Sequence, residues 1–204
     1  MALSFDARTS RKTLFAPFSR NNASKCESMA RPMPRRRASG CTAISRISAV
    51  SKARLAAAKP APYDQQILLV HNVCLAQGDI DAAKKVMNNV YFAICPLSNI
   101  FIHNALPPID LMRENGLAIA LGTDSLSSND DLDMVKEMYC LHSAFPYVPM
   151  QEILTWASLN GAKFLKKDDV LGTLTAGKKP GIVLVDNLDE TGFVTAQSRS
   201  RRII

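Results

Sequence analysis

Three short apolar runs of the sequence each lead into polar side chains that could do chemistry. The run ILLV is followed by His71, the run YFAIC by Ser98 and Asn99, and the run IALGT by Asp124. In parallel α/β barrels the reacting groups gather at the carboxyl ends of the strands. We therefore expect these four side chains to face one another, where a histidine and a carboxylate can exchange protons or bind a cation.

Each of these residues also has an ordinary structural interpretation. A histidine at a strand end is often only packed against its neighbours. An aspartate that is followed by Ser125 and Ser127, as Asp124 is, can cap a helix or form a turn. The joint pattern over three successive strand ends is more specific than any single residue in it.

The elements that would position these side chains alternate along the chain. Strands are predicted over ILLVHN, VYFAICP and LAIALGTD. Helices are predicted over 79–89, with Asp79 as N-cap, over 107–116 and over 130–142, and one or two more are predicted over 150–165. Strands that alternate with helices indicate a parallel sheet, and strands that are apolar throughout indicate a sheet covered on both faces. GKKPGIVLVD and the residues from Gly192 onward predict two further strands in a small separate sheet.

The N-terminal part of the chain differs in composition from the rest. Residues 1–60 hold 13 lysines and arginines against two acidic residues, whereas residues 61–204 hold 12 against 16, so the net charge of +7 belongs to the N-terminal part. For residues 1–60 we keep four interpretations open: a disordered segment, an organelle transit peptide, an arm for nucleic acid or another acidic partner, and a damaged or mistranslated stretch.

Composition also excludes several classes of protein. No apolar stretch approaches the roughly 18 residues that a membrane-spanning helix needs. The five cysteines show no CxxC spacing, which argues against a disulfide framework and against a zinc ribbon. We expect buried thiols in a reducing compartment, and a cytoplasmic location without membrane contact.

Longer motifs carry a family resemblance. LLVHNV, CPLSNIFI, LPPIDLMRENGLAIALGTDSLSSNDDLDMVKEM and ILTWASLNGAKFL resemble the closing half of the amidohydrolase superfamily, over about Gln65 to Ile204. The tail motifs GKKPGIVLVD and QSRSRRII also resemble that family, and GTDSLSSNDDLDM is the most specific part. Within the superfamily, the similarity is to the cytosine-deaminase-like and adenosine-analogue-deaminase-like branch.

The resemblance implies an α/β fold, in which a (β/α)8 barrel lies beside a small β-sandwich. This chain would hold the C-terminal part of the barrel, about strands six to eight, plus short sandwich tail strands. We expect residues 1–62 to be basic and largely irregular, residues 63–165 to form the partial barrel, and residues 166–204 to supply the tail strands. A three-strand remnant cannot close a barrel, so we expect marginal stability or a homo-oligomer that covers the open edge.

The resemblance also implies roles for the four polar residues. His71 matches the sixth-strand histidine, which ligates a second metal or contacts the substrate. Asp124 matches the eighth-strand aspartate, which touches the metal and accepts a proton from the metal-bound water. A divalent cation lowers the pKa of its water to about 7, and the resulting hydroxide attacks the carbon that bears the leaving nitrogen. Ser98 and Asn99 match the seventh-strand motif and are expected at the substrate, in polar or structural roles.

The implied activity is hydrolysis of a non-peptide carbon–nitrogen bond by a metal-dependent deaminase. Its substrate would be a small molecule, an aminated nucleobase or an adenosine-like compound, and nucleic acid is not an expected partner. Zinc is the first expectation for the metal and iron the second. Ser125 and Asn129 match the loop after Asp124 and are expected to support it.

The histidine content departs from the family pattern. The chain has three histidines, His71, His103 and His142, and no two are separated by one residue, so the family's HxH pair and fifth-strand histidine have no counterpart. A catalytic zinc site normally takes three protein ligands. We therefore expect this chain alone not to hold the metal, and the alternative is a catalytically inactive truncated product or pseudo-enzyme. His103 is expected to pack or lie exposed, and His142 to act structurally or as a charge at a helix C-terminus.

Overall fold

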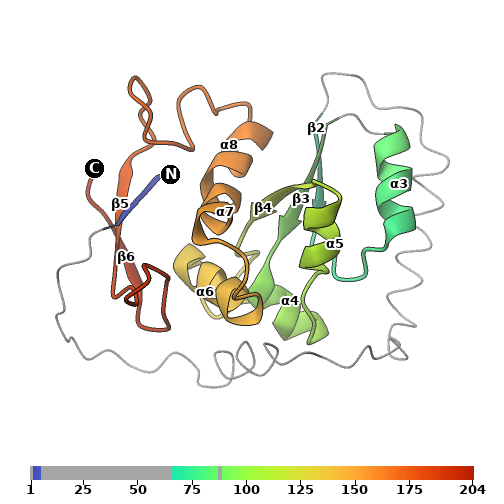
Figure 1. Cartoon of the computed structure of the whole chain (residues 1–204), viewed down its shortest axis with the longest axis horizontal. Helices are drawn as coiled ribbons and strands as arrows, with labels where there is room; N and C mark the ends of the chain where they lie inside the picture. Colours follow the sequence, from blue (N-terminus) through green and yellow to red (C-terminus); the bar gives the residue numbers. More distant parts are fainter. Residues whose placement is uncertain (1, 6–65, 87–88) are drawn as a thin grey trace.

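Two separate three-stranded sheets organise the protein in the computed structural model, which describes residues 2–5, 66–86 and 89–204 (Figure 1). The predictions for residues 6–62 lie outside these residues. The first sheet consists of β2 (Gln66–Val70), β3 (Asn89–Ile94) and β4 (Ala118–Leu121) in that order. Both pairings are parallel, which confirms the predicted parallel sheet. The assignment of these strands as the sixth to eighth of a barrel stays a prediction.

The helices follow the predicted alternation with strands. Their bounds are α3 (Gln77–Val86), α4 (Pro96–His103), α5 (Ile109–Glu114), α6 (Met134–Ala144), α7 (Met150–Leu154), the π-helical turn η1 (Thr155–Leu159) and α8 (Asn160–Phe164). The region 150–165, predicted as one or two helices, is three consecutive helical segments. β2 and β4 form the two edges of the parallel sheet within the described residues.

Two local predictions were wrong. No helix was predicted directly after β3, but this segment forms α4, because Pro96 at the first helical position has a backbone dihedral suited to a helix and no N–H to satisfy. Asp79 was expected to be an N-cap, but α3 begins two residues earlier, at Gln77. The Asp79 carboxylate instead accepts a hydrogen bond from the Ala76 N–H at 3.0 Å, as an acidic residue in the first turn of a helix can do.

The second sheet contains β1 (Ala2–Phe5), β5 (Ile182–Asp186) and β6 (Arg199–Arg202) in the order β1-β5-β6. β6 is antiparallel to β5, and β1 is parallel to it, with Ala2 opposite Ile182. No strand was expected in the N-terminal segment, so β1 is a correction. Its four residues carry no readable alternation, and the pairing depends on a strand far away in the sequence. The equivalence of this sheet to the family's β-sandwich stays a prediction.

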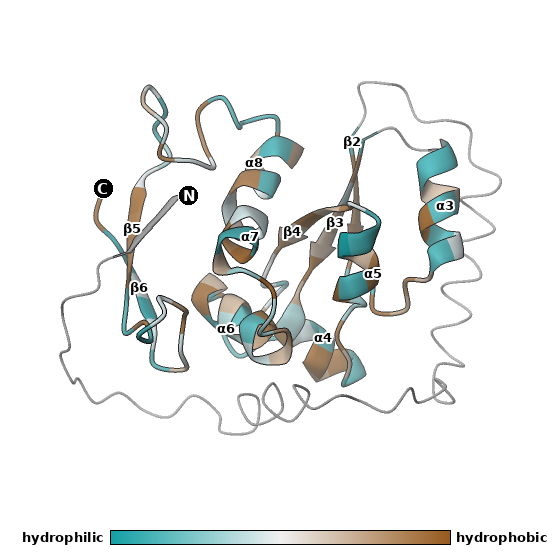
Figure 2. Ribbon diagram, in the orientation of Figure 1, coloured by the Kyte–Doolittle hydropathy of each residue, from teal (hydrophilic) through white to brown (hydrophobic). Residues whose placement is uncertain are grey.

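One apolar core joins the helices to both sheets. Its buried members are contributed by the parallel strands, by the helices and by the tail, and include Phe92, Ile94, Ile119, Met138, Leu141, Ile153, Trp156, Val185 and Val194. Figure 2 shows the hydrophobic colour along β3 and β4, with hydrophilic colour on the outer helices such as α3. Because Val185 and Val194 belong to the same cluster as Met138, the tail is packed against the barrel part.

Candidate functional site

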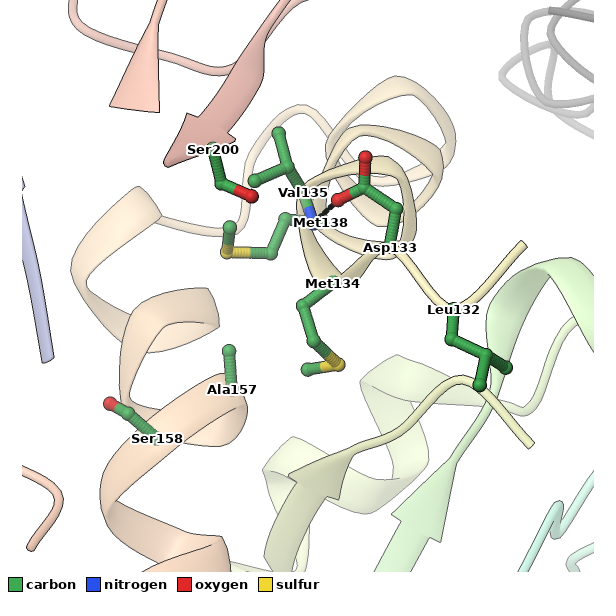
Figure 3. A pocket seen from close by; sticks show the side chains of 8 residues that line it. All are labelled: Leu132, Asp133, Met134, Val135, Met138, Ala157, Ser158 and Ser200. Carbon is green, nitrogen blue, oxygen red and sulfur yellow. Dashed lines mark hydrogen bonds between the residues drawn. The ribbon is translucent and has the colours of Figure 1, made fainter. Parts of the chain in front are cut away.

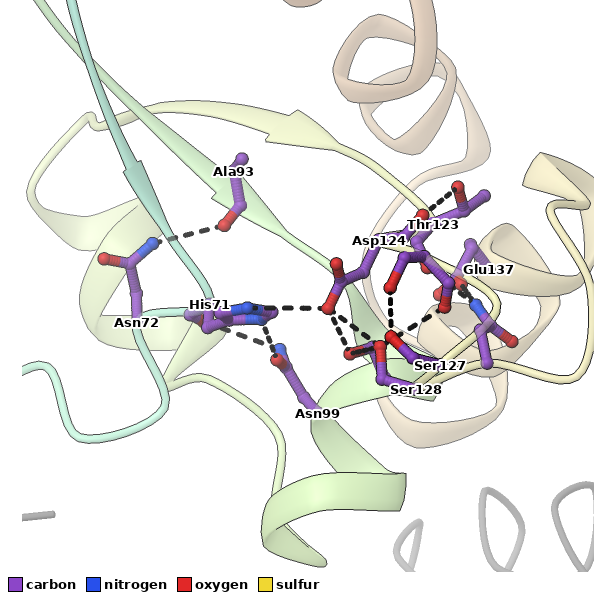
Figure 4. A network of polar contacts seen from close by, with 12 residues as sticks. His71, Asn72, Ala93, Asn99, Thr123, Asp124, Ser127, Ser128 and Glu137 are labelled. Carbon is purple, nitrogen blue, oxygen red and sulfur yellow. Dashed lines mark hydrogen bonds and ion pairs between the residues drawn. The ribbon is translucent and has the colours of Figure 1, made fainter.

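His71 and Asp124 approach each other at the carboxyl edge of the parallel sheet (Figure 4). His71 directly follows β2, and Asp124 comes shortly after β4. The His71 Nε2 atom lies 3.6 Å from Asp124 Oδ2, and about 30% of each side chain is exposed. The structure therefore brings the two predicted catalytic residues together where a small molecule can reach both.

A sharp turn after β2 aims the imidazole of His71. Both His71 and Asn72 have positive φ, 70° and 58°, which costs roughly 1–3 kcal/mol for a residue with a side chain. The His71 N–H donates to the Ala93 carbonyl at 2.9 Å, and the Asn72 amide donates to the Leu69 carbonyl at 2.9 Å. These bonds to β3 and β2 hold the turn in its left-handed conformation.

Asn99 on α4 fixes the orientation of the imidazole ring. His71 Nδ1 donates to the Asn99 side-chain oxygen at 2.9 Å. In the neutral ring this bond leaves the lone pair on Nε2, the nitrogen that faces Asp124. A proton or a cation between Nε2 and the carboxylate would therefore be favourable.

Two hydroxyl groups hold the carboxylate of Asp124. Ser98 Oγ and Ser128 Oγ donate to Asp124 Oδ2 at 2.8 and 2.9 Å. These hydrogen bonds are the main cause of a pKa of Asp124 below its ordinary value, and the neighbouring His71 lowers that pKa further. Asp124 is consequently ionised at neutral pH.

Ser98 and Asn99 are fully buried, and their contacts run to Asp124 and His71 respectively. Consecutive residues of one helical turn thus support the two catalytic candidates. Direct contact of Ser98 or Asn99 with a substrate stays a prediction. Ser128 was not singled out from the sequence, although its position four residues after Asp124, in the same polar loop, is the signal that could have found it.

The support expected from the loop after Asp124 comes from Asn129. Its side-chain amide donates to the Thr123 carbonyl at 2.8 Å and to the Glu137 carboxylate at 2.7 Å. Glu137 lies on α6, is fully buried and was missed from the sequence, because a glutamate in an amphipathic helix is usually a solvated residue. The Ser125 hydroxyl forms a hydrogen bond with the hydroxyl of Ser127 at 2.6 Å.

The other two histidines take structural positions. His103 is the last residue of α4. His142 stacks on Phe193 of the tail with ring centroids 4.0 Å apart. Burial lowers the pKa of His142 despite the neighbouring Asp189, so a positive charge at the C-terminus of α6 is disfavoured and packing is its role.

The described residues do not by themselves fit a catalytic metal centre. Within residues 2–5, 66–86 and 89–204, no group of three or more His, Cys, Asp or Glu side chains is arranged to hold a metal ion. His71 and Asp124 are two ligand-type side chains, whereas a catalytic zinc site normally uses three.

Helices that could cross a membrane are absent from the part of the chain that the structure describes.

A cavity of about 290 Å³ lies away from this chemistry, between α6, η1 and β6 (Figure 3). Its lining is mainly apolar and includes Met134, Val135 and Met138. The carboxylate of Asp133 in its wall accepts a hydrogen bond from the Val135 N–H and thereby caps α6. We therefore assign the candidate site to the His71–Asp124 edge.

Comparisons with known proteins find deaminases. The chain is 36% identical over 130 residues to a 5-methylthioadenosine/S-adenosylhomocysteine deaminase of Moorella thermoacetica, a match covering 60% of this chain and 30% of the relative. It is 32% identical over 131 residues to a 5'-deoxyadenosine deaminase of Methanosarcina acetivorans, covering 61% of this chain and 29% of the relative. The chain thus spans about 30% of the length of the curated relatives it matches.

A solved structure supports the same grouping. The aminofutalosine deaminase of Helicobacter pylori is similar with a TM-score of 0.50 and 27% identity, over 56% of this chain and 29% of that one. The model of the amidohydrolase family matches residues 46–203, well over half of the chain. The motifs after β2, β3 and β4, the site that they build and this match together show that the chain belongs to the amidohydrolase family.

Proposed function

We propose that this chain supplies the His71–Asp124 side of a deaminase-type active site that hydrolyses a non-peptide carbon–nitrogen bond of an adenosine-like compound. The observation that carries the proposal is the pair itself: an ionised carboxylate 3.6 Å from an oriented imidazole, after the carboxyl ends of β2 and β4, the strands on either side of β3. The names of the relatives, which are adenosine-analogue deaminases, support the reaction class.

Hydrolytic deamination needs groups that move protons. The attacking water must lose a proton, and the leaving ammonia must gain one. Asp124 is the proposed proton acceptor, because it is ionised and its Oδ2 is held by two hydroxyls. His71 is the proposed second catalytic and substrate-binding residue, since the Asn99 contact leaves Nε2 directed at the reacting region. Ser98 and Asn99 complete the proposed substrate-binding set.

Membership of the family points to a divalent metal, and we propose zinc before iron, with Asp124 as one ligand. The two ligand-type side chains of the site fall short of three. We therefore propose that further ligands come from residues outside the described part of the chain or from a second chain. One such arrangement is self-association that covers the outer edge of β2, where Val70 is 49% exposed. The sedimentation coefficient would show whether the chain self-associates.

A chimera tests the proposed function. Residues 66–204 of this chain would replace the matching segment of the Moorella thermoacetica relative, and ammonia release from 5-methylthioadenosine would be measured. We expect the chimera to be active and D124N to reduce kcat by about 100-fold or more, the usual range for a general acid–base group. D131N, which lies in the same loop, is the matched control and should keep most of the activity.

A folded chimera without activity, or one that D124N leaves unchanged, would contradict the proposed function. A measurement of melting temperature must accompany the assay, so that loss of activity is not confused with loss of fold.

The second candidate is a catalytically inactive truncated product or pseudo-enzyme. The specific observation in its favour is that the whole chain has three histidines, none of them in an HxH pair. Bound zinc and iron in the purified full chain, and its turnover of adenosine analogues, distinguish the candidates. Absence of both metal and turnover in the full chain, together with an inactive chimera, would favour this second candidate.

A further inference from the structure

Glu137 is a buried acid that the proposed chemistry does not use. It lies in the first turn of α6 and has no exposed surface. Its Oε2 accepts the backbone N–H of Leu97 at 2.9 Å, and its Oε1 accepts the side-chain amide of Asn129 at 2.7 Å. Figure 4 draws Glu137 at the end of the polar network away from His71.

The first of these bonds ties the first turn of α4 to α6. Leu97 directly precedes Ser98 and Asn99, the residues that hold Asp124 and His71. Since the N–H groups at the start of a helix have no partner within it, the Glu137 carboxyl is an external partner for this turn. A shift of Leu97 relative to α6 would move both supporting side chains together.

The second bond links α6, through Asn129, to the backbone next to Asp124. Asn129 donates both to Glu137 and to the carbonyl of Thr123, at 2.8 Å. That carbonyl shares a peptide plane with the nitrogen of Asp124, whose φ of 58° is left-handed. The NH₂ group of Asn129 thus bridges the Glu137 carboxyl and the Thr123 carbonyl, which links α6 to the peptide before Asp124.

Burial of the carboxyl is costly unless its oxygens are satisfied. Burial, together with the nearby Asp131 and Asp133, raises the pKa of Glu137 to about 8, against the lowering effect of the two hydrogen bonds. An apolar side chain at this position of α6 would avoid that cost. The two donors, one from each segment of the site, explain why a carboxyl fits here.

We propose that Glu137 is a positioning residue, which joins the start of α4 to the loop after β4 and so sets the geometry between His71 and Asp124. This inference rests on the proposed function for the meaning of the site. It concerns a residue that touches neither catalytic candidate and acts through Leu97 and Asn129.

The substitution E137Q tests the inference with little change in shape. A glutamine accepts one of the two hydrogen bonds, and its NH₂ group then faces the second donor. If the NH₂ faces Asn129, that amide must turn over and leave the Thr123 carbonyl. N129A removes the same link to Thr123 without changing α6. Both variants should displace the imidazole resonances of His71.

The readout is the ¹H–¹⁵N spectrum of the imidazole rings in the full chain, which has three histidines, with His71 assigned through H71Q. The matched control is M138A, because Met138 is the next residue of α6, is 1% exposed and packs in the apolar core. We expect E137Q and N129A to displace the His71 cross-peak, and M138A to lower the melting temperature while that cross-peak stays in place.

An unchanged His71 cross-peak in folded E137Q would overturn the inference and leave Glu137 a purely structural residue. If E137Q does not fold, the position of the His71 cross-peak in N129A tests the inference instead. The spectrum needs neither metal nor turnover, so failure of the proposed deaminase activity would be seen separately in the assay of the chimera.

Discussion

His71 and Asp124 are each held by one of two consecutive residues of α4, Asn99 and Ser98. The first pair is joined at 2.9 Å and the second at 2.8 Å, and the two catalytic candidates then lie 3.6 Å apart. A single helical turn therefore sets the distance between groups that belong to different strands. The structure of α4 is for this reason as important to the site as the strand ends are.

Removal of the Ser98 hydroxyl should weaken the hold on Asp124. We expect S98A to raise the pKa of Asp124 and to lower the free energy of unfolding by about 1.5–3 kcal/mol, because a hydrogen bond to a charged group is lost. Carbonyl NMR of Asp124 during an acid titration and urea unfolding measure the two effects. S125A is the control and should change stability by less than about 0.5 kcal/mol. An unshifted Asp124 titration in S98A would contradict the assignment.

The turn after β2 predicts an order of stability for variants of Asn72. Both N72A and N72G lose the bond to the Leu69 carbonyl, but alanine also keeps a strained φ of 58°, which glycine adopts freely. We expect N72A to be less stable than N72G by about 1 kcal/mol in urea unfolding. Equal stability of the two variants would show that the left-handed turn is not maintained in solution.

The raised pKa of Glu137 predicts that the stability of the protein depends on pH. Its pKa is raised from 4.5 to about 8 in the folded protein, so the folded state binds more protons than the unfolded state between these values. The stabilisation is complete below about pH 4.5 and is lost as the pH rises towards 8. Urea unfolding at a series of pH values should show this decline in the wild type and a flatter profile in E137Q. Identical profiles would count against a protonated Glu137.

The lowered pKa of His142 predicts a pH dependence of stability with the opposite sign. Burial lowers its pKa below 6.5, so the unfolded state binds more protons as the pH falls below that value, and stability falls with it. H142Q should lose this decline. The near-ultraviolet signal of the aromatic residues can report on the contact with Phe193, and F193A should remove the same pH dependence. A decline that survives in both variants must have another origin.

Much of the fold around the site could be predicted from the sequence, because apolar runs and helical periods are local patterns. Apart from α4, the order of strands and helices from β2 to α8 followed from these patterns, and the polar residues after the strands indicated His71 and Asp124. The helix α4 was missed because Pro96 usually ends an element, although at a first helical position it begins one.

The other missing parts of the prediction depend on contacts that form only in the folded chain. Glu137 looks like a surface residue of α6, and only its contacts with Leu97 and Asn129 explain its burial. Ser128 donates a hydrogen bond to Asp124 only once the turn between the two residues has formed. The strand β1 has no pattern of its own and exists through its pairing with β5.

The pairing of β1 with β5 has a consequence for synthesis of the protein. Ala2–Phe5 leaves the ribosome long before Ile182 is translated, yet these segments are neighbours in one sheet. β1 therefore has no pairing partner during the time in which the parallel sheet and its helices are already able to fold. Contacts between distant parts of a chain form slowly, so completion of the tail sheet is expected to be a late step of folding.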